Sequence, residues 1–162
     1  MGSVFFDPAH DHAHCAEAAI TNAENVCAKR AQRLTPIRKR VLKVLAASHR
    51  PLGAYEIMNR LGEGGEHPAP ITVYRALEFL VANGFVHRIE SRNAYLACVR
   101  HHVSGAAVVF LICERCGVVG EACSQHVAAS LASAARGAGF RPAAPVIEVS
   151  GVCSHCGQGE RN

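Results

Sequence analysis

The sequence predicts an α/β (α+β) chain with two domains, residues 1–98 and residues 99–162. In the first domain, four helical patterns are followed by two short strand-like runs, which is the order of a winged helix-turn-helix. In the second domain, strand-like runs flank one Ala-rich helix, which predicts a small αβ domain. Two Cys-x-x-Cys pairs bracket most of this second domain.

The N-terminal segment is predicted to be a tail followed by two helices. Residues 1–14 are rich in His and Asp and have no apolar period, so we expect them to be disordered. Residues 16–32 carry apolar side chains at helical spacing. Thr35 and Pro36 then suit the N-cap and the first position of a second helix, whose basic residues lie opposite its apolar stripe.

Two further helices and a hairpin complete the first domain. A short helix is predicted from Ala54 to about Gly62, and a Gly- and Pro-rich loop follows it. Pro70 opens a fourth helix, which ends at the Asn83-Gly84 pair. The runs FVHRIE and NAYLAC predict a β-hairpin. The fourth helix therefore takes the place of a recognition helix, and the hairpin takes the place of the wing.

The second domain is predicted to contain three strands and one helix. The runs AVVFLIC and PVIEVSG are mainly apolar, which indicates buried strands. GVVGE is a shorter strand, and SQHVAASLASAARGAGF is a helix that ends at Gly137 and Gly139.

The two Cys-x-x-Cys pairs are the strongest chemical signal in the sequence. Each pair brings two thiolates together from one turn, and two such turns form the closed tetrahedral Cys₄ site that structural zinc prefers. A Gly follows each pair and suits the turn, because Gly accepts positive φ. Two disulfides or a redox-active pair are the alternatives, but a cytosolic chain favours metal. The four cysteines are Cys113, Cys116, Cys153 and Cys156.

Composition and charge favour a cytoplasmic protein that binds nucleic acid. No run approaches the roughly 20 apolar residues of a membrane span, and the N-terminus does not resemble a signal peptide. The net charge is +4, but residues 29–43, here called the basic segment, contain no acidic residue. Such a cluster is typical of a phosphate-binding surface, and a solvated helix face is the alternative. Its seven basic residues are Lys29, Arg30, Arg33, Arg38, Lys39, Arg40 and Lys43.

The order of the motifs resembles the ferric uptake regulator superfamily. The resemblance runs from about Cys27 to Cys156 and includes TVYRAL after Pro70, FVHRIES, ICERCGVVGE and a final CSHC. The patterns RLTPxR, TVYRALxFL, GFVHxxES and CxxCGxVxE, with a Cys ending the wing, are similar to those of the zinc uptake regulators. The resemblance implies a homodimeric, metal-responsive repressor with an N-terminal winged helix and a C-terminal dimerisation domain.

The resemblance also implies about two zinc ions per subunit. The Cys₄ set matches the structural zinc site. A regulatory zinc site at the hinge between the domains matches His87, Cys98 and Glu121. The fourth ligand of the family is a His in the loop after Cys98, where counting reaches Ala106, so His102 or His101 would replace it. A set of one Cys, two His and one Glu suits tetrahedral Zn²⁺.

The partner implied by the resemblance is double-stranded operator DNA. Tyr74 and Arg75 of the recognition helix would approach base edges, because Arg can bind guanine through two hydrogen bonds. Backbone contacts would come from Tyr55 and from three arginines of the basic segment. Packing is the alternative role of Tyr74. The expected DNA-binding residues are Tyr55, Thr72, Tyr74, Arg75, Arg33, Arg38 and Arg40.

We therefore expect a repressor that binds palindromic operator DNA when loaded with zinc and represses zinc-uptake genes. An iron-, other metal- or peroxide-sensing regulator of the superfamily is the alternative, although AVVFLI stands where those relatives have a His-rich stretch. A zinc-stapled protein that binds other proteins is a further alternative. An enzyme is not expected, because the HExxH, GxSxG and P-loop patterns are absent from the sequence.

Three cysteines have no assigned function. We expect Cys27 to be a core thiol and Cys123 to pack at the start of a helix, and Cys15 follows the His-rich tail. An auxiliary metal ligand is the alternative role of Cys123, because it follows Glu121 closely.

Overall fold

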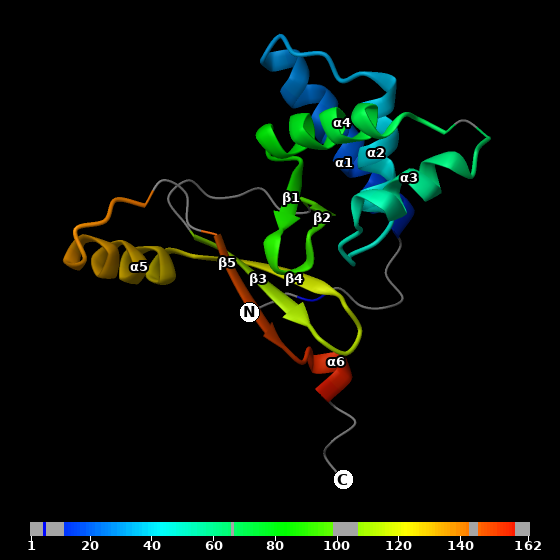
Figure 1. Cartoon of the computed structure of the whole chain (residues 1–162). Coiled ribbons are helices and arrows are strands. Elements are labelled where there is room, and N and C mark those ends of the chain that lie inside the picture. The colour runs from blue at the N-terminus through cyan, green and yellow to red at the C-terminus, as the bar shows by residue number, and fades with distance from the viewer. Residues whose placement is uncertain (1–4, 6–11, 66, 99–106, 143–145, 158–162) are drawn as a thin grey trace. The chain divides into compact units, whose positions relative to one another are not determined.

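A computed structural model describes residue 5 and residues 12–65, 67–98, 107–142 and 146–157. The chain divides into two compact units, residues 7–99 and residues 100–162 with residues 1–6. The N-terminal unit contains four helices and a two-stranded hairpin, and the C-terminal unit contains a three-stranded sheet and helices (Figure 1). The predicted winged helix and αβ unit are both confirmed. No helix among the described residues has both the length and the apolar character of a membrane span.

Helices α1 (His12–Lys29) and α2 (Pro36–Ala46) open the N-terminal unit. Pro36 occupies the first turn of α2 behind Thr35 at the N-cap, as the sequence predicts, because proline needs no hydrogen-bond partner there. Cys27 is a buried core thiol, which confirms its predicted place. The side chains at the centre of this unit come from all four helices and the hairpin.

Helices α3 (Ala54–Gly62) and α4 (Pro70–Ala82) precede the hairpin. The α4 helix buries Val73, Ala76, Leu77 and Leu80, the four residues that share one face of a helix with this spacing. It ends because Gly84 adopts a positive φ of 75°, a conformation that costs Gly little. The predicted bounds of α4 are therefore confirmed at both ends.

Strands β1 (Val86–Ile89) and β2 (Ala94–Ala97) form the antiparallel wing. A 3₁₀ turn over Glu90–Arg92 joins them, and Asn93 closes the turn in the left-handed region, with φ of 45°. Leu52 exchanges two backbone hydrogen bonds of 2.9 Å with Tyr95, which attaches the wing to the segment before α3.

The C-terminal unit contains strands β3 (Ala107–Cys113), β4 (Val119–Ser124) and β5 (Val146–Gly151) in the order β4-β3-β5. The β3 strand pairs antiparallel with β4 and parallel with β5. Helix α5 (Gln125–Gly137) connects β4 to β5, and its N-cap Ser124 accepts a hydrogen bond from the Val127 N–H. A single turn of helix, α6 (Ser154–Gly157), follows β5.

Three sequence-based expectations are wrong. Residues 12–14 were expected to be part of a disordered tail but begin α1, because the Ala-rich sequence extends the helix toward its N-terminus. The α1 helix ends at Lys29 rather than near Gln32, because Ala31 turns left-handed with φ of 52°. Strand β5 was expected to be buried but is an edge strand, with Val146 59% and Val149 47% exposed.

Candidate metal centres and nucleic-acid interface

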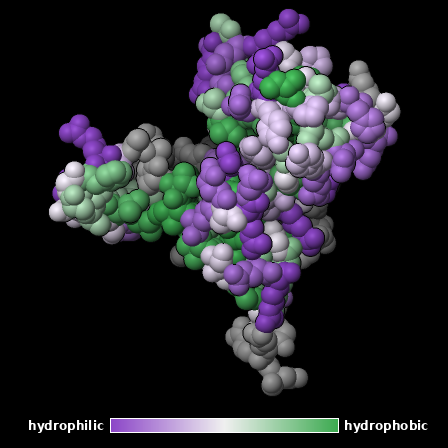
Figure 2. All heavy atoms as spheres, in the orientation of Figure 1, coloured by the Kyte–Doolittle hydropathy of each residue, from purple (hydrophilic) through white to green (hydrophobic). Residues whose placement is uncertain are grey.

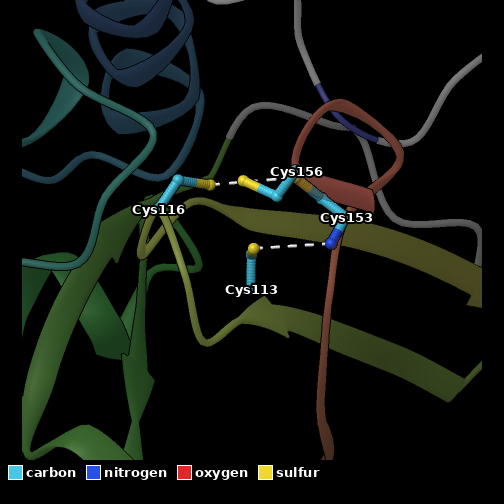
Figure 3. A group of neighbouring side chains, drawn as sticks. All are labelled: Cys113, Cys116, Cys153 and Cys156. Atoms are coloured by element: carbon cyan, nitrogen blue, oxygen red, sulfur yellow. Dashed lines mark hydrogen bonds between the residues drawn. The ribbon is translucent and has the colours of Figure 1, made fainter. Parts of the chain in front are cut away.

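The four cysteines of the two Cys-x-x-Cys pairs converge in the C-terminal unit (Figure 3). Cys113 ends β3 and Cys116 lies in the turn that follows, whereas Cys153 and Cys156 flank the start of α6. Their sulfur atoms all lie within 4.8 Å of one another. Cys113 and Cys153 are buried, and Cys116 and Cys156 are half-buried. The predicted Cys₄ set is therefore assembled by residues that are about forty positions apart in the chain.

A backbone hydrogen bond closes each of the two cysteine turns. The Gly117 N–H donates to Cys113 O at 2.9 Å in the first turn, and the Cys156 N–H donates to Cys153 O at 3.1 Å in the second. Gly117 has a positive φ of 74°, as predicted from its position after the pair. The same prediction is wrong for Gly157, which lies in α6 and does not need positive φ.

The sulfur spacing matches zinc rather than a disulfide. The Cys116 and Cys153 Sγ atoms are 3.8 Å apart. A tetrahedron with Zn–S bonds of about 2.3 Å has edges of about 3.8 Å, whereas a disulfide requires an S–S distance of about 2.05 Å. None of the four cysteines forms a disulfide.

The surroundings of the cysteines separate their pKa values. The backbone N–H groups of Cys116 and Cys153 donate toward the Cys113 sulfur and lower its pKa from 9.0 to about 6. Burial raises the pKa of Cys116. A hydrogen bond with Cys153 is the main cause that raises the pKa of Cys156 to about 12. The Cys113 thiolate therefore forms readily, and a divalent cation is the natural source of charge for stabilising thiolates at Cys116 and Cys156.

His87 and Cys98 form a second pair of candidate ligands, within the N-terminal unit. His87 lies on β1, and the Cys98 N–H donates to Phe85 O at 2.9 Å, which continues the ladder beyond β2. Because Cys98 then lies opposite Phe85, the two side chains share one face of the wing as diagonal neighbours. Their ligand atoms lie within 4.8 Å of each other. Imidazole and thiolate are both good zinc ligands.

The other predicted regulatory ligands lie elsewhere in the chain. Glu121 is a buried carboxylate on β4 of the C-terminal unit. His101, His102 and Ala106 lie outside the described residues. Cys123 lies exposed on β4 rather than packing at the start of α5, so its predicted role is wrong.

The predicted DNA-reading residues lie on the exposed side of α3 and α4. Tyr55 of α3 is 78% exposed, and Tyr74 lies outside the core cluster, which argues against its packing role. Arg75 is exposed, and its side chain forms no hydrogen bond or ion pair with the described residues. Thr72 is half-buried on the first turn of α4. The core residues of α4 point to its opposite face.

The basic segment is divided by its contacts. Arg30, Arg38, Lys39 and Arg40 each contact another side chain or carbonyl of the N-terminal unit. The side chains of Lys29, Arg33 and Lys43 make no such hydrogen bond or ion pair with the described residues. The sequence did not reveal this division, because the partners of Arg30 and Arg40, Asn83 and Leu61, are distant in the chain.

Comparison with known proteins identifies the family. The sequence model named ferric uptake regulator family matches residues 29–150. The chain is 38% identical, over 137 residues, to the zinc uptake regulation protein of Escherichia coli (strain K12). The matching region covers 85% of this chain and 80% of that relative. This chain belongs to the ferric uptake regulator family.

Solved structures of zinc uptake regulators have the same fold. One is a zinc uptake regulator complexed with zinc and DNA, with a TM-score of 0.83, 36% identity, and coverage of 91% of this chain and 98% of that one. Another is the holo form of XcZur, with a TM-score of 0.77, 41% identity, and coverage of 87% and 98%. The first of these relatives is a zinc uptake regulator by name.

Proposed function

We propose that this chain is a zinc-responsive transcriptional repressor that binds palindromic operator DNA when loaded with zinc and represses zinc-uptake genes. The observation that carries the proposal is the pair His87 and Cys98 on one face of the wing, in a chain similar to zinc uptake regulators. A ligand set that contains thiolate and imidazole favours zinc over metals that prefer oxygen ligands. A wing that holds metal ligands couples metal binding to the DNA-binding unit.

Each subunit would hold two zinc ions. The Cys₄ set would hold the structural ion, a role supported by the 3.8 Å sulfur spacing. His87, Cys98, Glu121 and His102 (or His101) would hold the regulatory ion, an assignment that rests on the family likeness and on the donor set. These ligands must lose their protons to bind, so occupancy of both sites should fall in acid.

Operator recognition is assigned to the exposed side of α3 and α4. Tyr74 and Arg75 would reach base edges in the major groove, and Thr72 and Tyr55 would support them. Arg33, with its exposed and uncommitted side chain, is the strongest candidate in the basic segment for a phosphate contact. The sequence also assigned backbone contacts to Arg38 and Arg40, whose side chains instead have partners inside the N-terminal unit.

A homodimer is supported by the apolar surface of the C-terminal unit. Strand β5 has the composition of a buried strand but lies at the sheet edge, and none of the described α5 side chains is buried. Figure 2 shows hydrophobic residues gathered along the surface from α5 to the sheet. A second copy would cover this surface and would place two winged helices on a two-fold operator. The exposed apolar side chains are Val127, Leu131, Phe140, Val146, Val149 and Val152.

The proposal describes a cytoplasmic regulator and not an enzyme. Its relatives are named as regulators, and a complete set of four ligands at each zinc ion would leave no open position for substrate. A sensor of iron, another metal or peroxide in the same family is the alternative, which a comparison of metals in the experiment below would reveal.

The test is operator binding measured against buffered free zinc for the wild type and for Cys98→Ser. Fluorescence anisotropy with a zinc-uptake promoter fragment gives the affinity at each zinc level. We expect wild-type affinity to rise with zinc, and the variant to need at least about 100-fold more zinc, because even residues that only orient ligands contribute about 10- to 100-fold. Cys123→Ser, which removes an exposed thiol of β4, is the matched control and should behave as wild type.

Metal analysis should find the Cys₄ zinc still present in Cys98→Ser. Equal binding by both proteins at every zinc level would remove Cys98 from the sensor. A stronger response to iron or manganese than to zinc would favour the alternative.

A further inference from the structure

The contacts of Arg38 distinguish it from the exposed basic residues of the basic segment. Its guanidinium lies over the Phe79 ring of α4, with Cζ 3.5 Å from the ring centroid. Its Nη1 donates to Arg33 O at 2.5 Å, so the flat face and one edge of the guanidinium are both occupied. The hydrogen bond uses one of the five N–H donors of Arg38, and the stacking on Phe79 restrains the plane of the guanidinium.

Arg30 reaches the same end of α4. Its Nη1 donates to Asn83 Oδ1 at 3.3 Å, and Asn83 is the C-cap of α4. Asn83 Nδ2 in turn donates to Phe79 O at 2.9 Å. The two arginines, from the end of α1 and the first turns of α2, therefore meet the last turn of α4 through Phe79 and Asn83.

The end of α4 needs positive charge and has none of its own. The last turn of a helix carries partial negative charge from its uncompensated carbonyls, and cations there are stabilising. The last turn of α4 contains no basic residue. Arg30 and Arg38 supply two positive charges at this end, although they lie more than forty residues earlier in the sequence.

The opposite end of α4 carries Tyr74 and Arg75, the residues to which the proposed function assigns base recognition. Because α4 is a continuous helix, contacts that restrain its last turn at Phe79 and Asn83 also restrain the direction of its axis. They therefore influence where Tyr74 and Arg75 point. Stacking on a ring favours the planar guanidinium over the ammonium of lysine.

We propose that Arg38, assisted by Arg30, is a positioning residue that orients the recognition helix α4, and that it is not a phosphate contact. This inference rests on the proposed function, because orientation of α4 acts through operator DNA. The basic segment then has two roles. Arg30 and Arg38 set sequence specificity. Arg33 and the other basic side chains that make no hydrogen bond or ion pair with the described residues supply salt-dependent attraction to any duplex.

The experiment measures zinc-loaded protein on operator DNA and on an unrelated duplex over a range of salt. Arg38→Lys keeps the charge and loses the planar stack, and Phe79→Leu keeps Arg38 but removes the ring. Each is expected to lower the ratio of operator to non-specific affinity roughly fivefold, with no change in the slope of log affinity against log salt. Because they break one contact, the double variant should lose little more than either single variant.

Arg33→Ala is the control for a phosphate contact. It should weaken binding to both duplexes alike and reduce the salt slope by about one. Normal operator binding by Arg38→Lys and Phe79→Leu, with a shallower salt slope for Arg38→Ala, would show that Arg38 contacts phosphate and would overturn the inference.

Amide hydrogen exchange without DNA separates this inference from the proposed function. Arg38→Lys and Phe79→Leu should speed exchange in the last turn of α4 while the preceding turns, which bury Val73, Ala76 and Leu77, keep their protection. Unchanged exchange there would overturn the positioning role. If the wild type shows no zinc-dependent operator binding, the proposed function fails, and the exchange result still decides whether Arg38 restrains α4.

Discussion

The backbone N–H of Cys153 donates to the sulfur of Cys113 at 3.4 Å, across 40 positions of sequence. This hydrogen bond joins the two cysteine turns without any metal, because it connects the end of β3 to the residue that precedes α6. It also favours the thiolate form of Cys113, since an N–H donor stabilises negative charge on sulfur. The C-terminal unit therefore has one cysteine prepared for metal before the metal arrives.

The first prediction concerns the ionisation of Cys113 in the metal-free, reduced protein. Its pKa of about 6 lies below the ordinary 9.0, so its thiolate stabilises the folded unit fully above pH 9. That contribution shrinks as the pH falls and is lost below about pH 6. Ultraviolet thiolate absorbance should show one step near pH 6 that is missing in Cys113→Ser. A first step near pH 9 would contradict the prediction.

The second prediction concerns metal content. Cys153→Ser removes one of the four thiolates of the Cys₄ set and should lower its zinc affinity by more than about 100-fold. Elemental analysis after desalting should find one zinc fewer per chain than in the wild type. Cys123→Ser is the matched control, because its thiol is exposed on β4 and outside the set. A Cys153→Ser protein that keeps all its zinc would exclude Cys153 as a ligand.

The third prediction compares the glycines that follow the two cysteine pairs. Gly117→Ala should destabilise the zinc-loaded C-terminal unit by about 1–2 kcal/mol, because a left-handed alanine is strained. The strain is purely conformational, since a Cβ at Gly117 would meet no atom within 4 Å. Gly157→Ala should be close to neutral, because Gly157 lies in α6 and its Cβ would meet only Val152 at 3.9 Å. Equal losses of thermal stability in the two variants would contradict this account.

The fourth prediction concerns assembly. Val149→Asp places a carboxylate on the exposed edge strand β5, where the proposed dimer would bury it without a partner. Sedimentation should show a dimer for the wild type and a monomer for the variant, with the zinc content of the Cys₄ set unchanged. Val81→Asp, which alters an exposed valine of α4, is the control and should remain a dimer. A dimeric Val149→Asp protein would place the interface elsewhere.

Local signals made much of the N-terminal unit predictable from its sequence. Pro70 and the Asn83-Gly84 pair influence only the backbone within a few residues, so the sequence alone predicted both ends of α4. The Cys₄ set was predictable for a different reason, because the spacing of two Cys-x-x-Cys pairs reflects a metal geometry that few other structures share.

Other features were not predictable, because they depend on residues far apart in the chain. The apolar run of β5 has the same composition whether the strand is central or at an edge, and only the order β4-β3-β5 leaves it exposed. Arg38 and Arg33 look equivalent in the sequence. Phe79, which distinguishes them, lies 41 positions after Arg38, beyond the range of any helical period.

The parallel pairing of β3 with β5 has a consequence for the chain as it is synthesised. Residues 7–99 form a compact unit from one continuous stretch, so they can fold as soon as they leave the ribosome. β3 can pair with β4 once residues 119–124 have been synthesised, and its other edge stays open until residues 146–151 follow. Over the same interval Cys113 and Cys116 have been synthesised, but Cys153 and Cys156 have not. The N-terminal unit of each new chain can therefore be complete before the C-terminal sheet and the Cys₄ set are assembled.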